Sequence, residues 1–184
     1  MQKLAVSAVS LLFLMPFGVA QNAVKPHVDV PIVAARPDDV SAIEAIVKTS
    51  YETISGGAGV PRQWASERTL NDPNARFVAA VVDAKTGQTK VWSVSDQEFA
   101  DQADASMVRD GFTEHELGHQ IHRYGNVATV LSSYEGRGEH DPKAERGVNI
   151  FQLYFDGKRW WILSITWDTE RTGNAIPAEL LPKN

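Results

Sequence analysis

The closing part of this 184-residue chain, VNIFQLYFDGKRWWILSITWDTE from Val148 to Glu170, constrains its fold more than any other segment. Two runs rich in branched and aromatic side chains are joined there by Asp156-Gly157. An Asp-Gly pair between two such runs is typical of a β-hairpin, because the tight turn needs residues that tolerate positive φ. The segment therefore predicts a pair of antiparallel strands near the end of the chain.

Three earlier segments carry helical patterns. In residues 37–57 the apolar side chains recur at helical spacing, with acidic residues at the start and two glycines at the end. A short second helix is predicted at about residues 62–69. In the third segment, residues 95–111, Ser95 or Asp96 is expected to cap the start of the helix.

The remaining segments between these helices and the hairpin favour strands. Residues 75–95 predict two strands joined through DAKTGQ, and the preceding NDPNA has the composition of a turn. YGNVATVLSSYEG, residues 124–136, is dominated by β-formers. The order is helix, helix, strand, strand, helix and a four-strand meander. It predicts an α+β fold with about three helices on one face of a curved, mostly antiparallel sheet of about six strands.

The two ends differ from this central region. MQKLAVSAVSLLFLMPFGVA begins with a positive charge, continues with a short apolar stretch and ends in small residues, as secretory signals do. An uncleaved membrane anchor is the alternative, but Pro16 interrupts the short apolar run. The predicted plan is a signal peptide at 1–20, an extended lead-in at 21–36, one domain at 37–170 and an irregular tail at 171–184.

The composition limits the cell compartments and the classes of partner that fit this chain. The absence of cysteine excludes a lipid-anchored lipoprotein and a disulfide framework. Removing Lys3 with the signal changes the formal charge from −5 to −6, and a mildly acidic protein without a basic patch argues against nucleic acid as a partner. We expect an exported protein, periplasmic or secreted, that is not held in a membrane after signal cleavage.

FTEHELGHQIHRYG, residues 112–125, contains H-E-x-x-H, the pattern of zinc proteases. On a helix His115 and His119 would lie close enough to share a metal ion. In a strand they would be about 13 Å apart, too far for ligands that sit roughly 2 Å from zinc. The segment runs directly into β-forming sequence, and the longer H-E-x-x-H-x-x-G-x-x-H pattern fails at His122 and Gly125. We therefore expect a strand here and no metal site or other cofactor.

The order of elements, together with local phrases, resembles the nuclear transport factor 2-like superfamily of cone-shaped α+β rolls. The phrases are VSAIEAIVKTSYETI, RQWASERTLNDPNARFVAAV, RYGNVATVLSSYEGRG and FQLYFDGKRWWILSITWDTE. This superfamily includes ketosteroid isomerase, scytalone dehydratase and SnoaL-like polyketide cyclases. The last two phrases are the more specific, and they resemble secreted bacterial members without an assigned activity. The resemblance implies a cystatin-like roll with a pocket between the helices and the concave sheet. No catalytic set of the superfamily matches residue by residue, so the catalytic residues stay unknown.

Side chains expected near such a pocket are aromatic or polar residues of the predicted elements: Tyr51, Trp64, Trp92, His115, His119, Ser133, Gln152 and Trp167. If Leu117 and Ile121 face the core, both histidines share their side, and His119 could act as a general base or be a hydrogen-bonded structural residue. Glu116 then faces solvent or a partner.

The leading hypothesis is an exported domain that binds a small hydrophobic or aromatic molecule and forms a homodimer through its sheet. The second is a metal-independent isomerase, dehydratase or cyclase that uses a pocket His or Asp. An HExxH zinc peptidase is a distant third. Because the fold alone does not decide function, the side chains that enter the pocket have to separate these hypotheses.

Overall fold

A computed structural model describes residues 26–83 and 86–182 of the chain. The predicted signal peptide, residues 1–20, lies outside this range. Within it, no helix is both long enough and apolar enough to cross a membrane. Of the predicted lead-in, residues 21–25 also lie outside this range. Residues 26–36 have no helix or strand, and Val30 is buried against the helices.

In this part of the chain, six strands form one sheet in the order β2-β1-β6-β5-β4-β3. β1 and β6 pair in parallel, and every other neighbouring pair is antiparallel. The strands span Asn71–Val82 (β1), Thr89–Ser95 (β2), Thr113–Tyr124 (β3), Val127–Arg137 (β4), Glu145–Phe155 (β5) and Trp160–Thr169 (β6).

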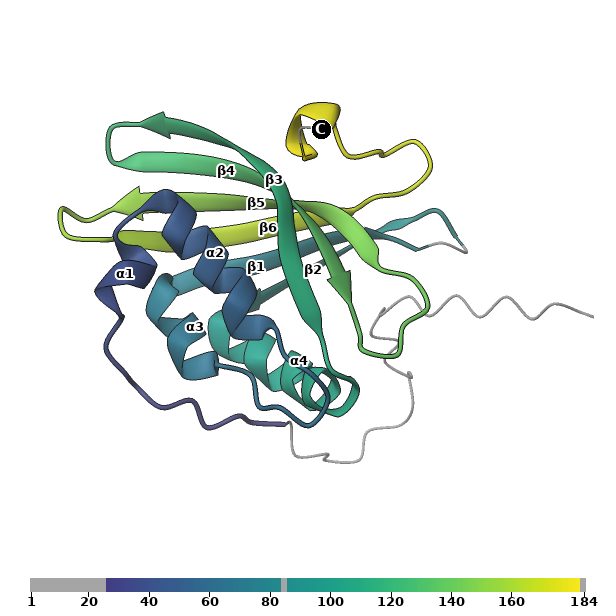
Figure 1. The fold of residues 1–184 in the computed structure, drawn as a ribbon, viewed down its shortest axis with the longest axis horizontal. Coiled ribbons are helices and arrows are strands. Elements are labelled where there is room, and N and C mark those ends of the chain that lie inside the picture. The colour runs from purple at the N-terminus through teal and green to yellow at the C-terminus, as the bar shows by residue number, and fades with distance from the viewer. Residues whose placement is uncertain (1–25, 84–85, 183–184) are drawn as a thin grey trace, which may run out of the picture.

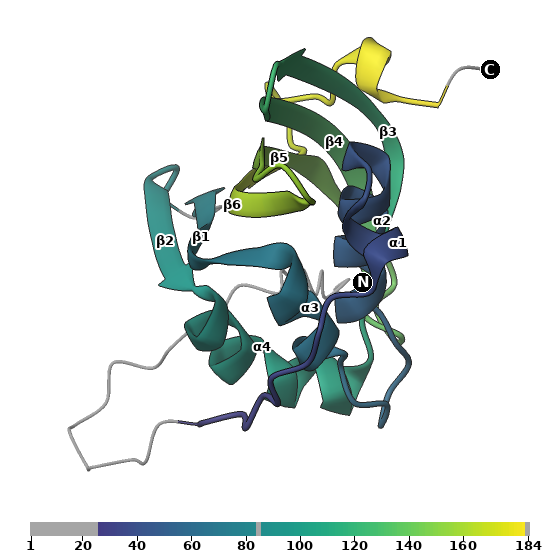
Figure 2. The ribbon, with the colours of Figure 1, turned by 90° about the vertical axis from the view of Figure 1, so that its left-hand side faces the viewer.

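The helices lie on the concave face of this sheet. They span Pro37–Val40 (α1), Ile43–Ile54 (α2), Trp64–Leu70 (α3) and Asp96–Asp110 (α4), and a short 3-10 turn, η1, covers Ala178–Leu180. Figures 1 and 2 show α2, α3 and α4 beneath the curved sheet, whereas η1 lies on the other side of β3 and β4. The arrangement leaves most of the outer sheet face without a covering helix.

The core sits between these two layers. Ile46 of α2, Leu70 of α3, Phe151 of β5 and Ile162 of β6 are each at most 1% exposed. Period-two alternation in the strands and helical spacing in α2 direct these side chains to the same interior, where burial of apolar surface stabilises the fold. Ser95 caps α4 through a capping box, as its position before the helix predicts.

The α+β class, the strand count and the closing meander are confirmed, and two local predictions are wrong. NDPNA is part of β1, where a register shift between Asn71 and Arg76 absorbs its proline and its Asx turn. The predicted first helix is interrupted at Ser41-Ala42 and becomes α1 and α2.

The HELGH segment is a strand, as predicted, but it contains a β-bulge between Glu116 and Gly118. His115 pairs with Glu135 on the outer face, whereas His119 pairs with Ser132 on the inner face. A bulge adds one residue to one strand and so reverses the alternation that follows it. The expectation that His115 and His119 share a side is therefore wrong.

Candidate functional site

A cavity of about 210 Å³ lies between the concave sheet and the helices. Its apolar wall includes Phe77, Phe99, Phe112, Phe151, Ile165 and Trp167. The polar side chains among its lining come from both layers: Tyr51 and Glu67 from helices, and Glu114, Tyr134 and Asn149 from strands. A mostly apolar hollow with a few convergent polar groups is the usual form of a small-molecule site.

A second, larger hollow of about 560 Å³ lies between α1, α2 and α3. Charged and polar side chains such as Arg36, Asp38 and Gln63 dominate its lining, and Lys48 and Glu52 of α2 form an ion pair along one side of it. It lacks the apolar wall of the smaller cavity. We therefore regard the smaller cavity as the candidate site.

Glu114 is placed in the cavity by the end of α2. The Ser55 hydroxyl accepts a hydrogen bond of 2.9 Å from the Glu114 backbone N–H. Next to it, Gly56 and Phe112 exchange backbone hydrogen bonds of 2.7 and 2.9 Å in an isolated antiparallel bridge. The start of β3 is thus fixed to the helical layer, and the Glu114 side chain projects into the space between the layers.

The environment of Glu114 makes its carboxyl group weakly acidic. Burial raises the pKa of Glu114 to about 7, the hydrogen bond from Asn149 lowers it, and the nearby Glu145 carboxylate raises it. Asn149 Nδ2 donates to Oε1 over 3.1 Å. The other oxygen, Oε2, makes no hydrogen bond to any described residue. This carboxyl group therefore gains or loses its proton near neutral pH, with one oxygen free toward the cavity.

Tyr134 adds a second free polar group to the same wall. Burial, with the neighbouring Glu114 charge, raises the pKa of its phenol, so the hydroxyl stays protonated. Within the described part of the chain the Tyr134 hydroxyl has no hydrogen-bond partner. It is therefore available as a donor beside Glu114.

A chain of hydrogen bonds leads from Glu114 away from the cavity. Asn149 Nδ2 also donates to the Tyr51 hydroxyl over 3.2 Å. Tyr51 and Ser132 share a hydrogen bond of 2.7 Å, and Ser132 donates to Glu116 Oε1 over 2.6 Å. The other Glu116 oxygen lies 2.9 Å from His119 Nδ1. The prediction that Glu116 faces away from the core is wrong, because the bulge follows Glu116 and leaves it on the inner face.

Glu67 reaches the cavity from α3 and is 1% exposed. Burial raises its pKa to about 7, although the hydrogen bond from Thr53 opposes the shift and the nearby Asp96 charge adds to it. Asn71 Nδ2 lies 3.3 Å from its second oxygen. With both oxygens engaged, Glu67 is a structural acid rather than a group presented to a ligand.

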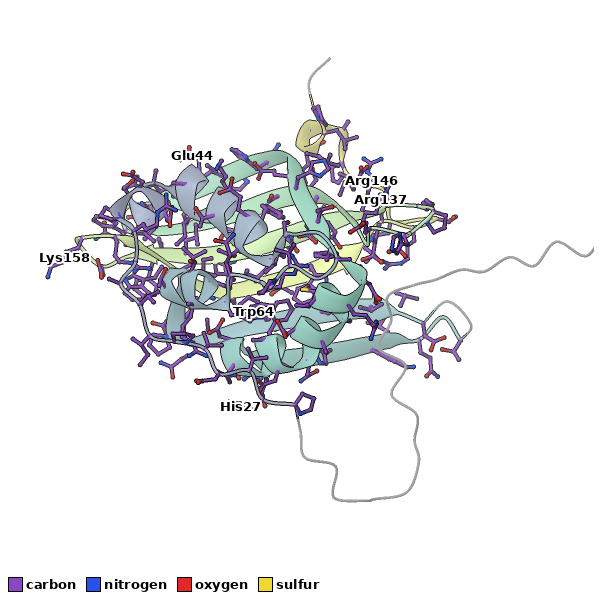
Figure 3. All side chains as sticks on the ribbon, turned by 60° about the horizontal axis from the view of Figure 1, so that its bottom comes forward. His27, Glu44, Trp64, Arg137, Arg146 and Lys158 are labelled. Atoms are coloured by element: carbon purple, nitrogen blue, oxygen red, sulfur yellow. The ribbon has the colours of Figure 1, made fainter. Side chains whose placement is uncertain are left out.

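The mouth of the cavity carries charged side chains of both signs. Arg137 and Lys143 line it together with Asp141 and Glu145, around the loop between β4 and β5. Figure 3 shows Arg137 toward the end of the sheet opposite the β5–β6 turn, where Lys158 is labelled. Burial and the Asp141 charge raise the pKa of Glu145.

Of the eight residues predicted from sequence, Tyr51 and Trp167 line the cavity. Trp92 lies behind this wall, with its ring 5.9 Å from that of Trp167. Trp64 is buried in the helical layer, where Nε1 donates to Asp104 over 2.6 Å (Figure 3). Neither of these two tryptophans belongs to the lining, because other aromatic rings stand between them and the space.

The other four predicted residues lie elsewhere. Ser133 donates to the Leu180 carbonyl, and Gln152 accepts from Thr129 over 3.0 Å, both on the outer face. His115 is also outward, and His119 lies on the inner face but beyond the cavity wall. Period-two alternation assigns Ser133 and Gln152 to the face opposite Tyr134 and Phe151. The prediction that these four residues line the pocket is therefore wrong.

The histidine pattern does not form a metal centre in this strand. The imidazoles of His115 and His119 belong to opposite faces of the sheet, so they cannot share one ion. Among residues 26–83 and 86–182, no group of three or more His, Asp or Glu side chains is arranged to hold a metal.

The sequence matches no protein-family model, and no curated protein is significantly similar to it. Solved structures with the same architecture exist. A protein of unknown function from Mycobacterium tuberculosis has 15% identity and a TM-score of 0.54, over 74% of this chain and 80% of its own. An NTF2-like protein with a cystatin-like fold from Novosphingobium aromaticivorans has 10% identity and a TM-score of 0.53, over 70% and 80%.

A third structure is an NTF2-like protein of unknown function from Methylobacillus flagellatus. It has 14% identity and a TM-score of 0.50, covering 76% of this chain and 98% of that one. At these identities the likeness shows the fold alone. The chain has the cystatin-like, NTF2-like α+β fold, and its function has to be argued from its own side chains.

Proposed function

We propose that this protein binds a small, mostly apolar molecule that carries one hydrogen-bonding oxygen. The observation that supports this most is the pair of free polar groups on an otherwise aromatic wall, Glu114 Oε2 and the Tyr134 hydroxyl. Neither group has a protein partner in the described part of the chain, so a ligand oxygen that enters the cavity can form hydrogen bonds with them.

The size of the cavity limits the ligand. An apolar cavity of roughly 150 Å³ is enough to hold benzene. The 210 Å³ found here fits a substituted aromatic ring or a small fused bicycle. The charged mouth, with Arg137 and Lys143 beside Asp141 and Glu145, tolerates polar substituents that extend toward solvent.

The protonation state of Glu114 determines whether the site can bind a ligand carbonyl oxygen. Below a pH of about 7 the Glu114 acid donates a hydrogen bond to a carbonyl oxygen, and above it the carboxylate repels that oxygen. Affinity for a ketone should therefore fall as the pH rises through about 7, whereas affinity for a hydrocarbon of the same shape should not change.

The test compares 1-indanone with indane, which have the same fused rings and differ by one carbonyl. Binding is followed by NMR at pH 5.5 and pH 8.5. We expect 1-indanone to bind more tightly than indane at the lower pH and to lose at least about tenfold in affinity at the higher pH. Glu114→Gln keeps a neutral donor and should remove this pH dependence, and Glu44→Gln on the exposed face of α2 should leave it intact (Figure 3). Equal, pH-independent binding of the two probes would contradict the proposal.

A second candidate function is metal-independent proton transfer, with Glu114 in the role that the sequence assigned to a His or Asp. It is favoured by a carboxyl pKa of about 7, suited to a general base at neutral pH, beside a phenol that can donate to an enolate oxygen. Glu114 would take a proton from the carbon next to a ketone, and the electron pair of the broken C–H bond would form the enolate.

This candidate is tested by exchange of the C2 protons of 1-indanone for deuterium in D₂O. Catalysed exchange that disappears in Glu114→Gln and weakens in Tyr134→Phe favours an enzyme. If the protein binds 1-indanone but does not catalyse the exchange, only the binding function is supported.

We also propose export through the N-terminal segment at residues 1–20, on the basis of its sequence pattern. Its test is the mass of the protein recovered from the periplasm or medium of a bacterial culture. A chain that begins at Gln21 is expected.

A further inference from the structure

The hydrogen-bonded chain behind the cavity has a fixed direction, and its start is Glu116. An ionised carboxylate group only accepts hydrogen bonds. The single hydroxyl proton of Ser132 is therefore used toward Glu116 Oε1, 2.6 Å away. His119 Nδ1 engages the other carboxylate oxygen at 2.9 Å.

The direction passes from Ser132 to Tyr51. Because the Ser132 proton is already used, its oxygen can only accept from the Tyr51 hydroxyl, 2.7 Å away. Tyr51 in turn has one proton, which it gives to Ser132. Its oxygen must then accept, and the group within reach is the side-chain amide of Asn149, at 3.2 Å.

Asn149 completes the chain at Glu114. An amide can turn either its nitrogen or its oxygen to a neighbour, and the surrounding hydrogen bonds decide which. Here Tyr51 requires the nitrogen, so the second N–H of the same nitrogen points to Glu114 Oε1 at 3.1 Å. Oε1 is held as an acceptor, and a proton on the Glu114 carboxyl group belongs on Oε2.

We propose that Glu116, acting through Ser132, Tyr51 and Asn149, is a positioning residue that fixes Oε2 as the protonated oxygen of Glu114. The inference rests on the proposed function in so far as Oε2 is the atom offered to a ligand. It gives a role to the glutamate of the HELGH motif that involves no metal. The β-bulge is what allows this role, because Glu116 and His119 both face inward only when the alternation is reversed between them.

The chain orients hydrogen bonds but does not conduct protons. Asn149 carries amide hydrogens that are not released at neutral pH, so a proton cannot pass between Tyr51 and Glu114 through it. Glu114 therefore exchanges its proton through the cavity, and the chain acts on Glu114 only through the hydrogen bond that Asn149 donates.

Ser132→Ala tests this because it cuts the chain without changing any charge. Tyr51 then loses the oxygen that accepts its proton. We expect the hydroxyl to turn to Asn149, so that the amide presents its oxygen to both Tyr51 and Glu114. Glu114 becomes a donor to that oxygen, which favours its protonated form. The other ionisable groups that face Glu114 or line its cavity are Glu145 from β5, Tyr134 from β4, Tyr51 from α2, Glu67 from α3 and, at the mouth, Asp141, Arg137 and Lys143. Ser132→Ala replaces none of them, and the resonance of the Glu114 carboxyl carbon is followed separately from that of Glu67.

The measurement is the pH titration of the Glu114 carboxyl carbon by NMR in ligand-free, ¹³C-labelled protein. We expect Ser132→Ala to move the pKa of Glu114 upward by about one pH unit, a tenfold change in proton affinity. Ser133→Ala is the matched control, because the next hydroxyl along β4 faces outward and donates to the Leu180 carbonyl. Ser132→Thr retains a hydroxyl and should keep the pKa near that of the native protein.

An unchanged or lowered pKa of Glu114 in Ser132→Ala would overturn the inference, since a purely electrostatic influence of Glu116 predicts no change. The titration uses no ligand, so it separates this inference from the proposed function. A protein that shows the shift but binds neither 1-indanone nor indane retains the positioning role and loses the binding function. A protein that binds 1-indanone selectively but shows no shift in the pKa of Glu114 retains the binding function and loses the positioning role.

Discussion

Two carboxyl groups, Glu67 and Glu114, enter the same cavity from opposite layers, and each has a pKa of about 7. Glu114 presents a free oxygen, whereas both oxygens of Glu67 accept hydrogen bonds from Thr53 and Asn71. The side chain of Glu67 thus joins α2 to the start of β1 through Thr53 and Asn71. The two acids therefore serve different purposes, one for a ligand and one for the fold.

Glu67 should make the fold less stable as the pH rises. Its pKa is raised on folding, so its contribution is fully present below the unfolded value of about 4.5 and is lost as the pH rises through about 7. The loss should reach up to about 3 kcal/mol of unfolding free energy. Urea unfolding at several pH values between 4 and 8 measures it.

In that series Glu67→Gln should flatten the slope, because a side-chain amide does not ionise in this pH range. A residual slope in the same direction is expected from Glu114. Glu52→Gln, an exposed change on α2, serves as the control and should leave the slope as it is. A slope that Glu67→Gln does not alter would show that folding leaves the pKa of Glu67 unchanged, against the prediction.

Among single residues, the sequence patterns predicted two side chains that line the cavity but missed Glu114, its main polar group. Tyr51 and Trp167 were predicted because aromatic residues on helical or alternating faces point inward. Glu114 was missed because Leu117 and Ile121 set the parity of the whole segment, and the bulge breaks that parity between Glu116 and Gly118. Gly118 was the available signal, since glycine inside a strand often marks a bulge or a close backbone approach.

At the scale of elements, strongly patterned segments were predictable and irregular ones were not. The hairpin of β5 and β6 follows from two apolar runs around Asp156-Gly157. NDPNA has the composition of a turn, yet it runs as the irregular start of β1, because Asn71 pairs with Ile162 before the register shifts. The pairing that decides this comes from β6, about ninety residues further along the chain.

The contact between β3 and the C-terminal turn should depend on Gly118. A Cβ atom there would lie 2.7 Å from the Leu180 carbonyl oxygen, so η1 or β3 has to move. We expect Gly118→Ala to lower the unfolding free energy by about 1–3 kcal/mol, as overpacking does, and to expose residues 171–182 to protease. Denaturant unfolding and limited proteolysis with mass spectrometry measure the two effects.

Gly57→Ala is the matched control, because its Cβ would stand at an ordinary 3.5 Å from Glu139. Equal stability of Gly118→Ala and the native protein would mean that the C-terminal turn is not held against β3 in solution.

In the whole molecule, the two faces of the sheet have different surroundings. The helices close the concave face around the cavity, and the outer face of the sheet stays largely bare apart from the C-terminal segment over β3 and β4 (Figure 2). Val91 on β2 and Leu163 on β6 are 69% and 47% exposed. The order of helices and strands made this division predictable, whereas the content of the cavity depends on one bulge and on contacts between distant segments.

We propose that this bare face joins two copies of the chain, since exposed apolar side chains on an uncovered sheet favour burial against a second surface. Light scattering after gel filtration should give twice the mass of one chain. Leu163→Arg puts a charge into the joined face, where its desolvation is unfavourable, and should give a single-chain mass with the cavity intact. Val60→Arg, at a residue of similar exposure (50%) in the α2–α3 loop, should leave the dimer unchanged. A native protein that elutes with the mass of one chain at all concentrations contradicts the dimer and shows that Val91 and Leu163 stay exposed to water.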